Sequence, residues 1–126
     1  MAHAEPVVGG TGVGDLSPHF SLAEFADRRT GCAPLPQPRL LLVLEAIRAR
    51  AGRPVRIVSG HRCPSSNRAV GGALDSRHLY GDAADIPAGL VNVDQAAACG
   101  AVGIGERDGW AIHVDVRPGP PARWSY

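Results

Sequence analysis

Two short apolar runs on either side of one tight turn constrain the fold of this chain more than any other feature. The runs cover residues 102–105 and 110–116, and Glu106-Arg107-Asp108-Gly109 connects them. Asp-Gly is a preferred pair at the tip of a β-hairpin, because both positions of its turn need a positive φ angle. The sequence therefore predicts two adjacent antiparallel strands.

The second run carries polar residues that a purely structural strand would not need. His113 and Asp115 alternate with apolar neighbours, so they should share one face with Ala111. Upstream, a glycine and two alanines lie between His78 and Asp85. Two imidazoles and one carboxylate suit a catalytic zinc site, which takes three protein ligands and leaves a position for water. The sequence predicts His78, Asp85 and His113 as Zn²⁺ ligands; a hydrogen-bonded polar cluster without metal is the alternative.

The remaining segments predict short elements around this hairpin. Apolar residues recur at helical spacing between Leu40 and Ala51, and Gly52 follows as a stop. Residues 117–126 form a proline-rich tail. We expect an α+β fold with a small, mostly antiparallel sheet, flanking short helices and the zinc site on the sheet face. The other expected elements are a short helix from about Leu22, a helix over 37–51, a strand over 54–60, a helical turn over 67–70, a strand over 83–86 and a helix over 94–99.

Length and charge restrict the classes of function. A chain of 126 residues is one domain of ordinary size, and we expect a flexible lead-in over 1–18 and a single domain over 19–126. The net charge of +1 gives no electrostatic case for nucleic acid, and no apolar run approaches a membrane span. We therefore expect a monomer with no nucleic-acid partner and no membrane insertion. The first residues also lack the pattern of a secretory signal.

Three cysteines, Cys32, Cys63 and Cys99, cannot all pair within one chain. No CxxC pattern is present, so the usual spacing of a structural thiolate zinc site is missing. General rules favour three reduced, partly buried thiols. One disulfide, Cys32 to Cys63, is the alternative for an oxidising compartment.

A second group of functional candidates follows the expected strand over 54–60. Ser59 and Arg62 lie where loops carry function, and the Arg62 guanidinium could clamp a substrate carboxylate through two hydrogen bonds. Ser76 could orient a ligand or contact substrate, although a turn-forming serine is an equal alternative. We therefore expect Ser59, Arg62 and Ser76 to bind substrate, and His61 has no assigned role.

These blocks, in this order, resemble the zinc D-Ala-D-Ala carboxypeptidase family. Its members are peptidoglycan peptidases, grouped with lysostaphin and the hedgehog signalling domain by a shared metal site. The resemblance runs from about Phe20 to Trp124. The blocks that carry it are Ser59-Gly60-His61-Arg62, Asn67-Arg68-Ala69-Val70-Gly71-Gly72-Ala73, Ser76-x-His78-x-x-Gly81-x-Ala83-x-Asp85, Gly103-Ile104-Gly105, His113-Val114-Asp115-Val116 and Arg123-Trp124.

The resemblance implies a zinc peptidase domain that hydrolyses peptidoglycan stem peptides or crosslinks, as a carboxypeptidase or an endopeptidase. Its zinc ligands map to His78, Asp85 and His113, and its substrate-contacting arginine maps to Arg62. Such an enzyme acts on the cell wall, in the periplasm or outside the cell. Without a visible signal, we expect cytoplasmic synthesis followed by signal-independent release or by phage-type or injection-type delivery.

Two departures from the family pattern affect this expectation. His61 stands where the family usually has tyrosine, and Trp110 stands where many relatives place an acidic general base. Proton transfer would then fall to Glu106 or Asp115, with Asp108 behind them. The missing carboxylate keeps open a second hypothesis, a catalytically impaired zinc-binding module that binds or supports the cell wall.

Overall fold

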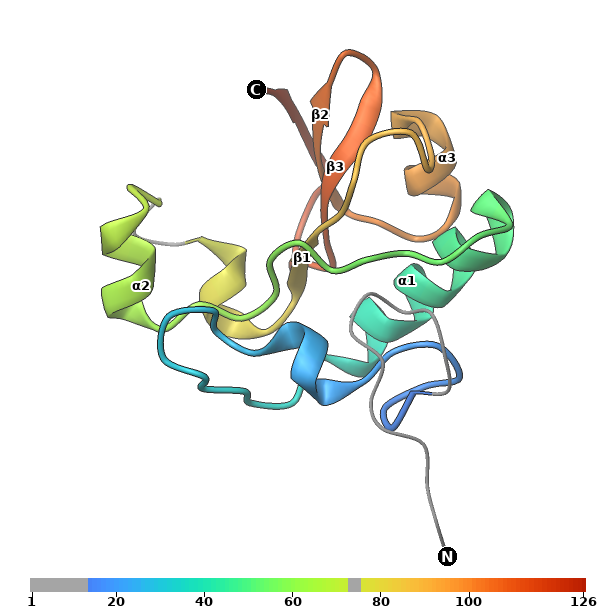
Figure 1. The fold of residues 1–126 in the computed structure, drawn as a ribbon. Coiled ribbons are helices and arrows are strands. Elements are labelled where there is room, and N and C mark those ends of the chain that lie inside the picture. Colours follow the sequence, from blue (N-terminus) through green and yellow to red (C-terminus); the bar gives the residue numbers. More distant parts are fainter. Residues whose placement is uncertain (1–13, 73–75) are drawn as a thin grey trace, which may run out of the picture.

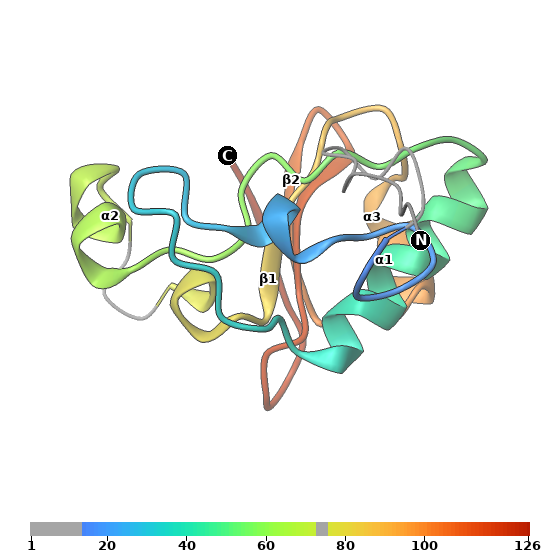
Figure 2. The ribbon, with the colours of Figure 1, turned by 60° about the horizontal axis from the view of Figure 1, so that its bottom comes forward.

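The computed structural model describes residues 14–72 and 76–126. Its centre is a four-stranded sheet with the strand order β1-β3-β2-β4. Helices α1 and α3 lie on one side of the sheet and α2 lies on the other (Figures 1 and 2). This arrangement confirms the α+β class. The elements are η1 (Leu22–Phe25), α1 (Pro38–Ala51), α2 (Pro64–Ala69), η2 (Arg77–Tyr80), β1 (Ala83–Asp85), α3 (Val93–Ala98), β2 (Gly103–Arg107), β3 (Trp110–Asp115) and β4 (Ala122–Ser125).

Strand β4 makes the sheet mixed, which corrects the expectation of a mostly antiparallel sheet. β1 and β2 both pair antiparallel with β3, whereas β4 pairs parallel with β2. Both edges of β3 are occupied by β1 and β2, so the chain that leaves β3 joins the sheet at the free edge of β2. Because this chain reverses direction after β3, it runs parallel to β2. The proline-rich tail thus ends in a strand that its composition did not predict.

The predicted hairpin is present, and it contains a bulge. Gly105 pairs with His113, but Glu106 pairs with Ala111, so β3 has one extra residue between the two pairs. A bulge shifts the alternation of side chains across a strand. Ala111 consequently packs in the hydrophobic core with Val114. The prediction that Ala111 shares a face with His113 is therefore wrong.

Several local predictions are confirmed. Helix α1 ends at Ala51, and Gly52 after it adopts the left-handed conformation with φ 70°. Asp108 and Gly109 have φ angles of 54° and 86°, as the expected hairpin turn requires. The helix expected over 94–99 is present as α3 (Val93–Ala98), and the side chain of Asn92 caps it by accepting a hydrogen bond from Gln95 N. The expected strand over 54–60 is instead an extended segment with a single bridge, between Ser59 and Asp85.

The core lies between the sheet and helices α1 and α3, and it leaves the opposite face of the sheet for polar side chains. Phe20 and Phe25 pack against each other with ring centroids 6.3 Å apart, as expected for residues that flank a helix start. Residues 1–13 of the expected lead-in lie outside the described residues, while Ser17 donates a hydrogen bond to Glu45 of α1. Within the described ranges, no helix has the length and apolarity needed to cross a membrane. The core buries residues Leu40, Val43, Leu44, Ile47, Val55, Ile57, Ala84, Ile86, Val91, Ala96, Ile104, Ala111 and Val114.

Candidate metal centre

The three predicted ligands converge on the polar face of the sheet. His78 comes from η2, Asp85 ends β1 and His113 lies on β3, and their ligand atoms are all within 4.8 Å of one another. The Oδ1 atom of Asp85 lies 3.2 Å from His78 Nε2 and 3.0 Å from His113 Nδ1. The two imidazole rings meet edge to face with centroids 5.2 Å apart. One nitrogen of each ring therefore points at the same small volume.

The other nitrogen of His78 is held by the backbone. Its Nδ1 lies 2.6 Å from the carbonyl oxygen of Gly60. A carbonyl oxygen can only accept, so Nδ1 carries the hydrogen and Nε2 presents its lone pair toward Asp85. The Oγ atom of Ser76 accepts from His78 N at 3.4 Å, and the backbone of Ser59 pairs with that of Asp85. Loop and strand thus fix both the position and the tautomer of His78.

The other nitrogen of His113 is held by a carboxylate. His113 Nε2 lies 2.8 Å from Asp115 Oδ2, and Arg117 donates to both oxygens of Asp115 at 2.9 and 2.7 Å. Metal-binding histidines almost always have such an acceptor on the nitrogen that faces away from the ion. Two imidazole nitrogens, each oriented from behind, and one carboxylate oxygen fit a zinc ion with an open fourth position.

The protonation states of the carboxylates and imidazoles are consistent with a metal site. Burial by itself would raise the pKa of Asp85, but the adjacent imidazoles of His113 and His78 hold that pKa well below its usual range. Burial likewise opposes ionisation of Asp115, and hydrogen bonds from His113 and Arg117 hold its pKa low. Burial disfavours the charged form of His113, yet Asp115 and Asp85 raise its pKa. Both carboxylates are therefore ionised at neutral pH, as a ligand and its supporting acceptor should be.

Two glycines of β2 leave space for the side chains that lie on this face of the sheet. A Cβ atom at Gly103 would lie 2.3 Å from a carboxylate oxygen of Asp115. A Cβ atom at Gly105 would lie 2.7 Å from Trp124 Nε1 and 2.6 Å from a ring carbon of Tyr126. Separations this short are sterically forbidden. The Gly-Ile-Gly block is thus required by the side chains opposite it.

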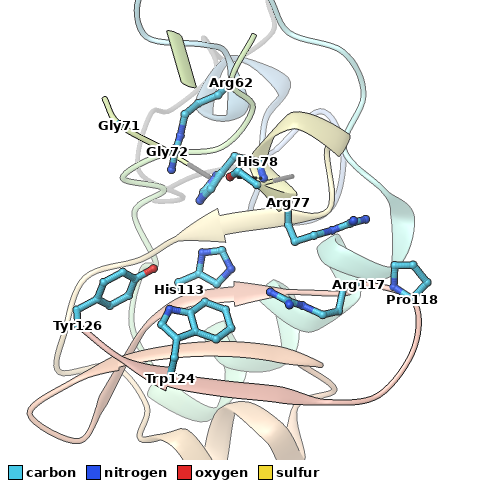
Figure 3. A pocket seen from close by; sticks show the side chains of 11 residues that line it. Arg62, Gly71, Gly72, Arg77, His78, His113, Arg117, Pro118, Trp124 and Tyr126 are labelled. Carbon is cyan, nitrogen blue, oxygen red and sulfur yellow. Dashed lines mark hydrogen bonds between the residues drawn. The ribbon is translucent and has the colours of Figure 1, made fainter. Parts of the chain in front are cut away.

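A pocket of about 620 Å³ opens over the centre (Figure 3). Trp124 forms one wall, with its ring centroid 5.1 Å from that of His113 and the Arg117 guanidinium 5.1 Å from its centre. Among the described residues, no carboxylate lines this pocket. The wall from β4 could not be predicted, because the tail was not recognised as a strand. The lining residues are Arg62, Gly71, Gly72, Ser76, Arg77, His78, His113, Arg117, Pro118, Trp124 and Tyr126.

The predicted substrate-binding residues lie at or beside the centre. Arg62 lines the pocket, with Nη1 donating to Asn67 Oδ1 at 3.1 Å and Nη2 lying 3.8 Å from Asp85 Oδ2. Ser76 also lines the pocket. Ser59 lines a smaller cavity of about 260 Å³, together with Arg62 and Asp85.

The three carboxylates considered for proton transfer differ sharply in position. Asp115 contacts His113 directly and is fully buried. Glu106 instead accepts hydrogen bonds from Ser125 Oγ at 2.6 Å and from Gly109 N at 2.9 Å. Asp108 occupies the tip of the hairpin turn. Of these three residues, the structure brings only Asp115 to the metal centre.

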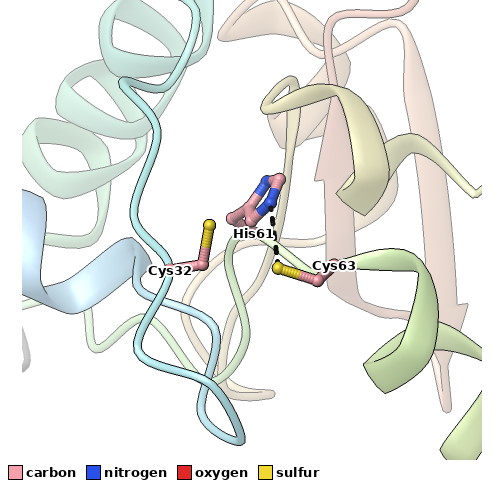
Figure 4. Close-up of side chains that lie close together, drawn as sticks. All are labelled: Cys32, His61 and Cys63. Atoms are coloured by element: carbon pink, nitrogen blue, oxygen red, sulfur yellow. Dashed lines mark hydrogen bonds between the residues drawn. The ribbon is translucent and has the colours of Figure 1, made fainter.

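A second cluster of ligand-type side chains was missed from the sequence. Cys32, His61 and Cys63 lie with their ligand atoms within 4.8 Å of one another (Figure 4). Both cysteines, like Cys99, are free thiols. The only local signal is a histidine two positions before a cysteine, which is too short a pattern to predict a site. Burial lowers the pKa of His61, so its imidazole is neutral at physiological pH.

The sequence matches the model of the Peptidase M15 family over residues 18–115. This chain belongs to the Peptidase M15 family. The match includes the three side chains that converge in the centre. A stretch of 47 residues is also 47% identical to the zinc D-Ala-D-Ala carboxypeptidase of Streptomyces albus G. That stretch is 36% of this chain and only 18% of that relative.

Proposed function

We propose that this M15 chain is a zinc-dependent peptidase that hydrolyses peptide bonds in peptidoglycan stem peptides or crosslinks. The observation that carries the proposal is the pair of imidazoles whose outward nitrogens are held by Gly60 and Asp115 while their inward nitrogens face Asp85. Family membership and the zinc carboxypeptidase relative support zinc as the metal. In this proposal, the enzyme acts as a monomer on the cell wall.

His78, Asp85 and His113 would hold the ion. Zinc in such a site polarises a carbonyl group and acidifies water. Arg62, whose Nη2 lies 3.8 Å from Asp85 Oδ2, would donate to the oxyanion that develops on the scissile carbonyl, and Ser59, which lines a cavity with Arg62, would contact the substrate. Trp124 and the other pocket walls exclude water from one side of the bound peptide.

The cationic lining favours a peptide that carries carboxylates. Arg62, Arg77 and Arg117 all line the pocket. Arg77 and Arg117 are paired with Asp82 and Asp115, which fixes their positions. Stem peptides end in a carboxylate, which bidentate arginine contacts recognise well. Ser76, on the same wall, would donate a further hydrogen bond.

Proton transfer is the least complete part of this site. Asp115 is bound on both sides by His113 and Arg117, and its low pKa makes it a weak base. We assign Asp115 the role of orienting His113. Glu106 would have to leave Ser125 and Gly109 before it could accept a proton at the centre.

The same geometry supports a second candidate function, that of a zinc-binding cell-wall module with impaired catalysis. The supporting observation is that no carboxylate of the described residues lines the pocket, with Trp110 at the position of the usual acid. Such a module would bind zinc and peptidoglycan and release no fragments.

Digestion of purified peptidoglycan, followed by mass analysis of the fragments, tests both functions. We expect the wild-type protein to release terminal D-alanine or cut crosslinks, and His113→Ala to lose this activity together with its zinc at the centre. His19→Ala is the matched control, because His19 pairs with Glu45 on α1 and does not line the pocket. Zinc binding without turnover selects the impaired module, and absence of zinc contradicts both.

A further inference from the structure

We propose that Cys32, His61 and Cys63 form a second metal site, which binds a thiophilic divalent ion such as Zn²⁺. Tetrahedral zinc sites with bond lengths of about 2.3 Å to sulfur and about 2.0–2.1 Å to nitrogen hold neighbouring ligand atoms roughly 3.5–3.8 Å apart. Here Cys63 Sγ lies 4.0 Å from His61 Nε2, and all three ligand atoms lie within 4.8 Å. Small side-chain rotations close this gap. Because Cys32 is exposed, water can reach the fourth position.

The backbone that carries these ligands is fixed in place. The carboxylate of Asp27 accepts from Cys63 N at 2.6 Å, and Asp27 N donates to Cys32 O at 2.7 Å. His61 N donates to Phe25 O at 2.8 Å. The two segments that supply the ligands are therefore tied to the same short stretch, residues 25–27. The site needs no large rearrangement to bind an ion.

The side chains of this cluster are held by fewer and weaker hydrogen bonds than its backbone. Cys63 Sγ has a weak contact with Thr30 Oγ1 at 3.5 Å, besides its contacts with His61 and Cys32. Within the described residues, His61 Nδ1 is buried without a hydrogen-bond partner. Figure 4 shows the two sulfur atoms and the imidazole directed toward one another from the two segments. Two thiolates also balance the charge of one divalent ion.

This second site shares its backbone with the first centre. Gly60 O, next to His61, accepts from His78 Nδ1 at 2.6 Å, and Arg62 N donates to His78 O at 3.0 Å. An ion bound to His61 and Cys63 would hold this segment, and hence His78, in place. Its inferred function is structural support of the first centre.

Titration of the reduced, metal-free protein with Co²⁺ tests the proposal. Thiolate ligands give cobalt an intense near-ultraviolet charge-transfer band, which histidine and carboxylate ligands do not. We expect the wild-type protein to bind two equivalents and to show this band. Cys32→Ser and Cys63→Ser should each abolish the band or reduce it by at least about half, whereas the control Cys99→Ser, at a thiol packed against the core, should leave it unchanged.

The outcomes separate this site from the proposed peptidase function. His113→Ala should keep the thiolate band and lose only one equivalent of metal. If Cys63→Ser fails to fold, His61→Gln serves instead, and it should weaken binding while keeping a thiolate band. Absence of the band in the wild-type protein would overturn the proposal, as would a Cys32–Cys63 disulfide that forms equally fast with and without excess Zn²⁺. Neither result would contradict the proposed hydrolysis of peptidoglycan by the first centre.

Discussion

The two ligand clusters of this protein are supported in different ways. In the first, each imidazole is oriented by its own acceptor, Gly60 O for His78 and Asp115 for His113. In the second, the side chains have few partners, and the carboxylate of Asp27 holds the backbone beneath them. The first cluster should have the higher affinity for a metal ion, since the outer acceptors fix the tautomer and the orientation of each imidazole ring. The metal affinity of the second cluster should depend on the stability of the loops that carry it.

The largest effect should follow from filling the space behind the first cluster. In Gly103→Ala, the new Cβ atom would clash with the Asp115 carboxylate at 2.3 Å, so that Asp115 and then His113 must move. We expect a loss of about 3 kcal/mol in the free energy of unfolding, the cost typical of severe overpacking. Urea unfolding measures the first effect, and bound zinc measured by mass spectrometry should fall in parallel.

Gly109→Ala is the control for this substitution. Nothing lies within 4 Å of a Cβ atom there, and only the positive φ of 86° opposes alanine. We expect a cost of about 1 kcal/mol and unchanged zinc at the first cluster. Equal zinc loss in both variants would show that the hairpin as a whole, and not the Asp115 carboxylate, controls the centre.

A smaller change removes the negative charge of the Asp115 side chain behind His113 and keeps the shape of that side chain. Asp115→Asn should weaken zinc binding at the first cluster about 10–100-fold, the usual effect of losing an outer partner of a histidine ligand. Competition with a chromophoric chelator measures this affinity, with Asp108→Asn in the exposed turn as control. The thiolate band of the second cluster should be unaffected; its loss would contradict the independence of the two supports.

The corresponding change beneath the second cluster is Asp27→Asn. The Asp27 carboxylate accepts hydrogen bonds from the backbone N–H groups of Cys63, Arg29 and Thr30. Burial opposes ionisation of this carboxyl group, but these hydrogen bonds hold its pKa well below the usual range. We expect a loss of about 2 kcal/mol in unfolding free energy. Urea unfolding at neutral pH measures it, with the exposed Asp94→Asn expected to cost under about 0.5 kcal/mol.

The pH dependence of that loss gives a second measurement. Because the pKa of Asp27 is lower in the folded than in the unfolded protein, its stabilisation is complete above the unfolded value of about 4. It declines as the pH falls from there through the folded pKa. The difference between the wild-type protein and Asp27→Asn should therefore shrink in acid. A difference that stays constant down to about pH 3 would contradict the role of the ionised carboxylate.

The smallest expected effect concerns the hydroxyl that supports Asp27. Ser66 is buried and its Oγ donates to Asp27 Oδ1 at 3.0 Å. Ser66→Ala should cost about 1 kcal/mol, the typical value of one hydrogen bond. Thermal unfolding measures the change, and the exposed neighbour Ser65 supplies the control Ser65→Ala. Equal shifts in both variants would assign the effect to α2 rather than to Asp27.

Sequence reasoning reached the first cluster because its signals are local. His78 and Asp85 fall within one short block, and His113 stands out in an apolar strand. The sequence also predicted the hairpin turn, from Asp108-Gly109, and the end of α1, from Gly52. The bulge was not, because it depends on how Glu106 pairs across the sheet.

The features that the sequence did not predict depend on contacts between distant segments. β4 forms because the edge of β2 is free, which the proline-rich composition of residues 117–126 conceals. The second cluster joins Cys32 to Cys63 through the hydrogen bonds of Asp27, without a recognisable ligand spacing. Such contacts become visible only when the chain is folded.

The position of Tyr126 has a practical consequence for anyone who expresses this protein. Tyr126 lines the pocket directly beside Trp124, with ring centroids 6.4 Å apart. Any chain that continues beyond this residue would begin at the rim of the pocket and compete with a peptide for space. Peptide binding to the pocket should therefore be compared between proteins with and without residues attached after Tyr126.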